Sequence, residues 1–164
     1  EVPPLCYDFS APTNWFNNPT NLAALGAHKK SWTSCNRAVE IKLVFAGDWM
    51  ESFASAVTGL LEGGVPVLAY FGEDDFIVNW LGGQAWTRAL KWSGHAGFLT
   101  AKNTSYIVGG ADAGSFKSHG GLTFMKLRDA GHLVPMDQPK TALDMLGKFL
   151  KGEPFAPGAN VVEA

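Results

Sequence analysis

The residues of this chain best suited to acid–base chemistry are one histidine, His132, and a run of three acids, Glu73, Asp74 and Asp75. His132 follows a glycine and precedes apolar residues and a proline, a setting that would hold the imidazole of a general base at a fixed angle. A carboxylate that accepts a hydrogen bond from Nδ1 of such a ring fixes its tautomer and stabilises its protonated form. The two segments therefore predict the histidine and the acid of a Ser-His-Asp hydrolase.

Simpler interpretations of both segments stay open from the residues alone. His132 can be an ordinary surface histidine. The three acids can form a turn and cap a helix that begins near Val78, because short carboxylates bond well to local backbone N–H groups. At most one of the three is expected to act in catalysis, while the others cap the helix or face solvent.

The nucleophile of such a hydrolase is missing from the chain. An acid followed by a histidine is the chain order of the α/β-hydrolases, whose serine comes first, within a Gly-x-Ser-x-Gly turn. That motif does not occur: Ser93, Ser115 and Ser118 lack glycines at the two required positions. Either the serine lies upstream, outside this chain, or the interpretation as such a hydrolase is wrong. The chain begins with Glu1 and not Met, so a processed or truncated product is expected.

Composition and the remaining histidines argue against several other classes of protein. His28, His95 and His119 stand at no metal-ligand spacing, and no glycine-rich phosphate loop occurs, so neither a metal nor a cofactor is expected. The net charge is −2 and no basic cluster occurs, which argues against nucleic acid or an anionic membrane surface as a partner. The longest apolar run, residues 65–71, is too short to cross a bilayer.

Two apolar segments are expected to place the acids and the histidine at one edge of a sheet. The chain has 164 residues, which suits one domain with a sizeable core. Residues 65–71 fit a strand buried on both faces, as in a parallel sheet, and the acids follow directly. Residues 122–127 form the next expected strand, and His132 lies in the loop 128–138 after it. Functional groups of open α/β sheets collect at the carboxyl ends of strands.

Helical periodicity and turn residues supply the other expected elements. Residues 1–20 are expected to be an extended entry segment, and 153–164 a loose tail. Short and long helices are expected over 19–25, from 36 to about 61, and over 78–90. A hairpin should pair 105–108 with 115–118. A final helix near Pro139 should close at Gly152 and bury Ala142, Met145, Leu146, Phe149 and Leu150. This alternation predicts α/β layering.

Several segments resemble the serine carboxypeptidases, the family of carboxypeptidase Y and cathepsin A. Residues 72–82, GEDDFIVNWLG, resemble the segment around the catalytic aspartate of that family. Residues 130–139, AGHLVPMDQP, resemble its catalytic-histidine segment. Further likenesses lie at 113–118, 122–124, 6–8, 17–19 and 34–36. The resemblance covers about residues 5 to 152.

The resemblance implies the C-terminal part of an α/β-hydrolase fold, with a mostly parallel sheet flanked by helices. Residues 1–152 would then be the C-terminal portion of one α/β-hydrolase domain. The resemblance also selects Asp75, the second acid of the family's Gly-Asp-x-Asp pattern, as the catalytic carboxylate, with Glu73 in place of the first acid. The implied reaction releases C-terminal residues from peptides. The alternatives are acyl transfer by a relative of the same fold, or a non-catalytic binding or protective partner.

The resemblance also implies roles for residues outside the acid–base pair. Val78 stands where the family often has a cysteine lining the substrate site, and Leu133 where it often has methionine, so both are candidate substrate-binding residues. Cys6 and Cys35 could be free or bridged to each other; the family implies disulfides to upstream cysteines outside this chain. Asn103 begins a glycosylation triplet, Asn-Thr-Ser. The implied partners are the upstream segment or larger chain carrying the serine, peptide substrates, and a second copy of the chain in a homodimer. The implied location is a vacuole, a lysosome or the outside of the cell.

Overall fold

The structure is a computed structural model that describes residues 7–156 in two compact units, Glu1–Glu51 and Ser52–Ala164. The first unit contains α1 (Ser10–Phe16), α2 (Pro19–Ala24), α3 (Arg37–Phe45) and the 3-10 turn η1 (Asp48–Met50). The expected short helix is confirmed as α2, which Asn18 caps by accepting a hydrogen bond from the N–H of Thr20 at 2.9 Å. The extended entry expected over 1–20 is wrong where α1 and the start of α2 lie.

The single helix expected from residue 36 to about 61 is wrong, because the chain turns within it. Asn36 caps the start of α3, and that helix ends at Phe45. Gly47 then adopts a φ of +76°, a left-handed conformation that stops an α-helix and that glycine adopts without strain. Helical structure resumes in the second unit with α4 (Ala54–Glu62).

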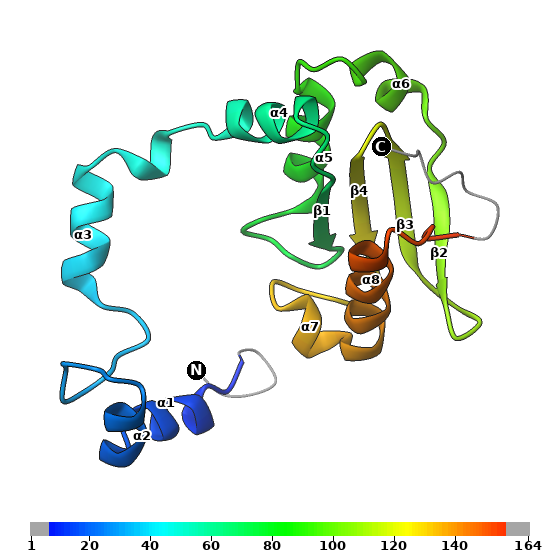
Figure 1. The fold of residues 1–164 in the computed structure, drawn as a ribbon. Helices are drawn as coiled ribbons and strands as arrows, with labels where there is room; N and C mark the ends of the chain where they lie inside the picture. The colour runs from blue at the N-terminus through cyan, green and yellow to red at the C-terminus, as the bar shows by residue number, and fades with distance from the viewer. Residues whose placement is uncertain (1–6, 157–164) are drawn as a thin grey trace. The chain divides into compact units, whose positions relative to one another are not determined.

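The second unit is built on a four-stranded sheet in the order β1-β4-β3-β2, visible in Figure 1. The strands are β1 (Val67–Gly72), β2 (Thr104–Val108), β3 (Ala111–His119) and β4 (Leu122–Leu127). β1 and β4 are parallel, and their registered pairs run from Val67 with Leu122 to Gly72 with Leu127. β2 and β3 form the expected hairpin, and β3 is antiparallel to β4.

The sheet therefore has fewer parallel pairings than expected. We expected a mostly parallel sheet, but within residues 7–156 only β1 and β4 pair in parallel. The tight connections through Gly109-Gly110 and Gly120-Gly121 force β2, β3 and β4 to alternate in direction, since parallel neighbours need a longer crossover. The connection from β1 to β4 is long and contains two helices, as a parallel pair requires.

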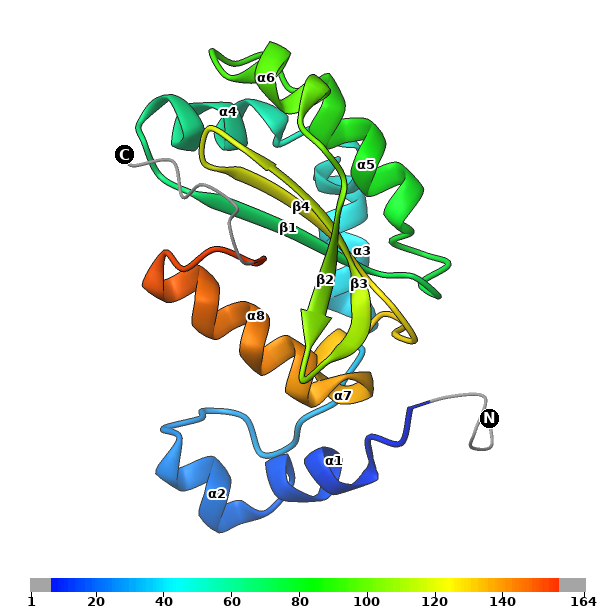
Figure 2. The same cartoon turned by 90° about the vertical axis from the view of Figure 1, so that its right-hand side faces the viewer.

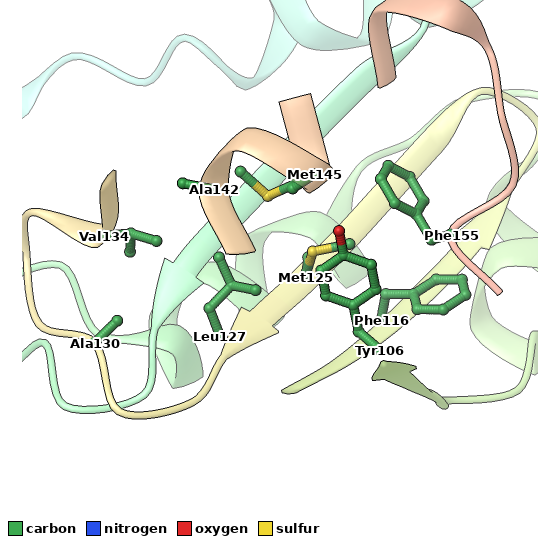
Figure 3. Close-up of a cluster of buried hydrophobic side chains, with 9 residues drawn as sticks. All are labelled: Tyr106, Phe116, Met125, Leu127, Ala130, Val134, Ala142, Met145 and Phe155. Atoms are coloured by element: carbon green, nitrogen blue, oxygen red, sulfur yellow. The ribbon is translucent and has the colours of Figure 1, made fainter. Parts of the chain in front are cut away.

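Helices cover both faces of the sheet, as Figure 2 shows. α4, α5 (Trp80–Ala89) and α6 (His95–Thr100) lie on one face, over a cluster that includes Leu61, Leu90, Phe98, Leu122 and Phe124. On the other face, α7 (Val134–Asp137) leads into α8 (Pro139–Lys151). The core there is the cluster of Figure 3, formed by Tyr106, Phe116, Met125, Leu127, Ala130, Val134, Ala142, Met145 and Phe155. The expected α/β layering is confirmed.

Strand β1 is less buried than its sequence predicts. We expected it to be covered on both faces, but Tyr70 is 41% exposed and only Ala69 and Gly72 of the strand are buried. β1 lies at the edge of the sheet in the described chain, and it has a neighbour only on the β4 side. The buried strand of the unit is instead β4, which lies between β1 and β3.

Helix α8 begins and ends where the sequence predicts, but it buries a narrower face. Ala142 and Met145 are buried, and Phe149 packs against the same core. The expected burial of Leu146 and Leu150 is wrong: they are 49% and 74% exposed, because only one side of the helix meets the sheet. After the helix, the ring of Phe155 packs against the rings of Tyr106 and Phe116, so the packed unit extends beyond Lys151. Residues 157–164 of the expected loose tail lie outside the described residues.

Candidate active site

The loops after β1 and β4 leave the sheet side by side, because the two strands are parallel neighbours that end in register. The backbone joins the loops directly: the N–H of Glu73 donates to the carbonyl of Leu127 at 2.8 Å, and that of Asp74 to the carbonyl of Ala130 at 2.9 Å. Gly72 makes this approach possible, since a β-carbon there would lie 2.2 Å from the carbonyl oxygen of Gly131. The segment of the acids and the segment of the histidine are therefore locked together.

The loop that carries His132 is fixed on both sides of the histidine. Ala130 and Val134 are 1% and 2% exposed and belong to the core cluster of Figure 3. Between them, the N–H of Gly131 donates to Oδ2 of Asp137, in α7, at 2.8 Å. The side chain of His132 itself is 59% exposed. The loop thus presents an accessible imidazole from a rigid backbone.

Asp75 meets this imidazole, so the two side chains lie together as the strand order predicts. Its Oδ2 lies 2.8 Å from Nδ1 of His132, while its Oδ1 accepts hydrogen bonds from the N–H groups of Ile77 at 3.0 Å and Val78 at 3.1 Å. Its side chain is only 8% exposed. One oxygen thus holds the carboxylate in its own turn and the other orients the ring, which leaves Nε2 of His132 as the nitrogen for proton transfer.

The charged state of Asp75 is favoured in this setting. Burial raises the pKa of its carboxyl, but the hydrogen bonds from His132 and from the backbone of Val78 and Ile77, with the attraction of the imidazole, lower that pKa below its ordinary value. The carboxylate is then negative when the imidazole gains a proton, which is the state in which it stabilises an imidazolium.

Of the other two acids of the turn, Asp74 faces solvent as expected, whereas Glu73 does not have an expected role. Glu73 neither caps a helix nor faces solvent freely: its carboxylate pairs with Lys126 of β4 and lies 4.0 Å from the guanidinium of Arg128. Asp74 is exposed. The helix α5 is capped by Asn79, whose side chain accepts a hydrogen bond from the N–H of Gly82 at 2.9 Å. The turn therefore offers one carboxylate, that of Asp75, to the histidine.

Apolar residues adjoin both members of the pair in sequence. Val78, which also holds Asp75 through its N–H, is 46% exposed, and Leu133 beside His132 is partly buried. Phe76 and Ile77, in the same turn, are 92% and 84% exposed. Among residues 7–156, no cluster of His, Cys, Asp and Glu is arranged to hold a metal ion, and no helix is both long and apolar enough to cross a membrane.

The remaining predicted site residues are two cysteines and the asparagine of the glycosylation triplet. Cys35 is exposed and has no disulfide, and Cys6 lies outside the described residues. Asn103 is exposed and directly precedes β2.

Sequence reasoning missed the residues that support the pair. Gly72 and Asp137 hold the two loops, and Lys126 binds the acidic turn. Gly72 carried a signal, because a glycine between a buried strand and a functional turn marks a close approach of backbones. The contacts of Asp137 and Lys126 depend on where separate segments meet, and no local spacing shows that.

A histidine bonded through Nδ1 to a shielded aspartate, on adjoining strand-end loops of a layered sheet, defines the class: part of an α/β-hydrolase fold. Comparisons with known proteins place it more narrowly. The sequence model of the serine carboxypeptidase family matches residues 2–152, and the chain belongs to that family. The expected family and fold class are confirmed.

The relatives are longer than this chain. It is 42% identical over 149 residues to serine carboxypeptidase 3 of Oryza sativa subsp. japonica, a match that covers 91% of this chain and 29% of the relative. It is 44% identical over 155 residues to carboxypeptidase Y homolog A of Uncinocarpus reesii, covering 91% and 28%. A solved structure, the prohormone-processing carboxypeptidase Kex1Δp of Saccharomyces cerevisiae, matches with a TM-score of 0.68 and 25% identity, covering 83% of this chain and 30% of that one.

Proposed function

We propose that this chain supplies the acid and the base of a serine-type carboxypeptidase, and that the nucleophilic serine lies in the remainder of the family domain. The observation that carries the proposal is the 2.8 Å hydrogen bond between Nδ1 of an exposed His132 and a nearly buried Asp75. Peptidases with a Ser-His-Asp triad use this arrangement, since a neutral imidazole of fixed tautomer presents Nε2 to the serine hydroxyl.

In the proposed reaction, Nε2 of His132 takes the proton of the serine hydroxyl as its oxygen attacks the C-terminal peptide carbonyl. The tetrahedral intermediate collapses when the protonated ring gives that proton to the leaving amine, and the C-terminal amino acid departs. Water then gives a proton to the same nitrogen as its oxygen attacks the acyl ester. The ring returns that proton to the serine oxygen as the ester bond breaks, and the shortened peptide departs. Asp75 stays ionised throughout and stabilises the imidazolium. Val78 and Leu133 are proposed to contact the substrate on either side of the pair.

The experiment replaces His132 by alanine in the full-length protein and measures release of C-terminal residues from peptides. We expect loss of activity, because alanine cannot accept the proton that the proposal assigns to the His132 ring. The matched control is His119→Ala, a histidine whose ring packs on Gly97 in the same unit. Wild-type-like release by the His132→Ala enzyme would overturn the assignment.

A fluorophosphonate probe, which labels activated serines, tests the missing nucleophile. The proposal is supported if the probe labels a segment or chain other than this one, and if His132→Ala abolishes that labelling. Absence of labelling in a folded, complete protein favours a non-catalytic partner instead. A comparison of peptide and glucose-ester donors separates hydrolysis from acyl transfer.

We further propose that the remainder of the family domain covers the free edge of β1 and the outer stripe of α8. Leu143, Leu146 and Leu150 stand at helical spacing on α8 and are 72%, 49% and 74% exposed. Exposed apolar area of this kind marks a contact surface. Leu146→Ser and Leu150→Ser should weaken co-purification with the serine-bearing part, whereas Lys151→Ser, at an exposed position next to the stripe, should not.

Consistent with this family, we expect the mature protein in a vacuole or lysosome or outside the cell. We expect disulfides from Cys6 and Cys35 to bridge it to the remainder of the family domain.

A further inference from the structure

One ammonium group contacts both ends of the segment that carries Asp75. Lys126, the fifth residue of β4, pairs through Nζ with the carboxylate of Glu73, and the same Nζ lies 4.8 Å from the centroid of the Trp80 ring. Glu73 directly follows β1, and Trp80 is the first residue of α5. The stretch between them, residues 74–79, is the turn that presents Asp75 to His132.

The positions of these contacts matter because the turn has few others. Phe76 and Ile77 are almost fully exposed, so the middle of the turn is not held by packing within the described chain. Backbone hydrogen bonds tie the start of this segment to β4 and to the histidine loop, from the N–H of Glu73 to Leu127 and from that of Asp74 to Ala130. The bonds that Asp75 accepts from Ile77 and Val78 fix the local shape of the turn beyond that point. The orientation of the turn past Asp74 therefore depends on side-chain contacts with β4.

Lys126 supplies such contacts from β4 itself, the strand that leads into the histidine loop. Its side chain is 21% exposed, and that of Glu73 is 29% exposed, so both charges are partly shielded from water. A second link reinforces the first: Arg128 reaches Glu73 at 4.0 Å and pairs with Asp112 of β3 at 2.7 Å. Glu73 is thus held from two sides, while Trp80 is held by the face of its ring.

We propose that Lys126 is a positioning residue for the reaction: its contacts with Glu73 and Trp80 set the angle at which Asp75 meets His132. The effect of Lys126 on kcat rests on the proposed function. Its effect on the Asp75–His132 hydrogen bond does not depend on that proposal. Loss of the ammonium releases the side chain of Glu73 and the ring of Trp80, while the backbone bonds of Glu73 and Asp74 remain. The far part of the turn then moves, and the Asp75–His132 hydrogen bond lengthens or breaks intermittently. Lys126 itself takes no part in proton transfer.

The test compares three variants of the full-length protein. Lys126→Met keeps the length of the side chain but removes its charge, and Lys126→Arg keeps a cation able to reach both a carboxylate and a ring. The matched control is Lys148→Met. Lys148 pairs with Asp144 at 2.6 Å and lies 5.1 Å from the centroid of the Tyr106 ring, the same combination of partners away from the catalytic pair.

We expect Lys126→Met to lower kcat by about 100-fold with little change in KM, because a small displacement of a catalytic group has effects of this size. Lys126→Arg should restore most of the loss, and Lys148→Met should retain wild-type kcat. The proposal is overturned if folded Lys126→Met enzyme keeps wild-type kcat, or if Lys148→Met loses as much. If Lys126→Met does not fold, Glu73→Gln decides by the same criteria.

A second readout separates this inference from the proposed function. The Nδ1 proton of a histidine bonded to a carboxylate gives a distinct low-field NMR resonance, which should broaden or shift in Lys126→Met and remain in Lys148→Met. If His132→Ala leaves activity intact, the proposed function fails, yet this resonance still tests Lys126. An unchanged resonance in Lys126→Met would overturn the positioning role even where kcat falls.

Discussion

The α-carbon of Gly72 faces the carbonyl oxygen of Gly131 so closely that a methyl group on Gly72 would lie 2.2 Å from it. The neighbouring carbonyl oxygen of Ala130 would stand at 2.3 Å. Both obstacles are backbone atoms, which cannot rotate away as a side chain can. The end of β1 and the loop of His132 are therefore in contact through main chain alone.

Gly72→Ala is accordingly expected to push the two loops apart. We expect a loss of about 1–3 kcal/mol in the free energy of unfolding, typical of overpacking, together with a large loss of activity as Asp75 moves from His132. Chemical denaturation and peptide hydrolysis of the full-length protein measure both. The control is Gly147→Ala, within α8, where a β-carbon meets nothing within 4 Å and helix propensity favours alanine by about 0.5–1 kcal/mol. Equal stability of Gly72→Ala and wild type would contradict the close approach.

Asp75→Asn tests the role of the carboxylate while preserving its shape. The amide can still fill the site, but it stabilises neither the required tautomer nor an imidazolium, so kcat should fall by about 10,000-fold. Asp74→Asn, a change of the exposed neighbour, should leave kcat close to wild type. Steady-state kinetics on a dipeptide substrate distinguish the two. Equal losses for both variants would mean that the acidic turn acts only through its overall charge.

The same variant tests the charge state of Asp75 in the folded protein. Because the pKa of Asp75 is lowered on folding, its ionised form adds stability that is fully present above the unfolded pKa, about 3.9, and is lost as pH falls through the folded value. The difference in unfolding free energy between wild type and Asp75→Asn should therefore shrink below about pH 4. Asp144, whose pKa is also lowered, contributes equally to both proteins and cancels. Chemical denaturation of both proteins from about pH 2 to about pH 6, roughly the range of carboxyl titration, measures this difference in unfolding free energy. A difference that stays constant over that range would exclude a lowered pKa for Asp75.

Asn103 is expected to carry an N-linked glycan when the full-length protein is made in a eukaryotic secretory host. The residue is exposed beside an edge strand, and its triplet ends at Ser105, which is also exposed. Mass spectrometry of the peptide containing Asn103, before and after glycosidase treatment, detects the modification. Ser105→Ala should abolish it and Ser105→Thr, which preserves the triplet, should retain it. An unmodified peptide in the wild-type protein would reject the site.

Local patterns predicted those parts of the molecule that depend on neighbouring residues. The strand 122–127, the hairpin around Gly109-Gly110 and the helix from Pro139 all lie where alternation, glycines and periodicity place them. The pairing of Asp75 with His132 also followed, since each residue comes directly after a strand and the strands are parallel.

The features that sequence reasoning could not predict depend on contacts between residues that are far apart in the sequence. Leu146 and Leu150 have the periodicity of buried residues, yet burial depends on whether another element covers them. Glu73 and Lys126 are far apart in sequence, and only the register of β1 with β4 brings them together. The break at Gly47 was missed because the apolar spacing continues on both sides of it, while a single left-handed residue interrupts the helix.

The hydrogen bond between Asp75 and His132 lies wholly within the unit that begins at Ser52. A recombination crossover at Glu51 would therefore exchange everything before it without separating the two residues or the strands beneath them. Chimeras between distant family members, joined at that point, should inherit an intact proton-handling module, and their differences in selectivity can then be assigned to the exchanged half.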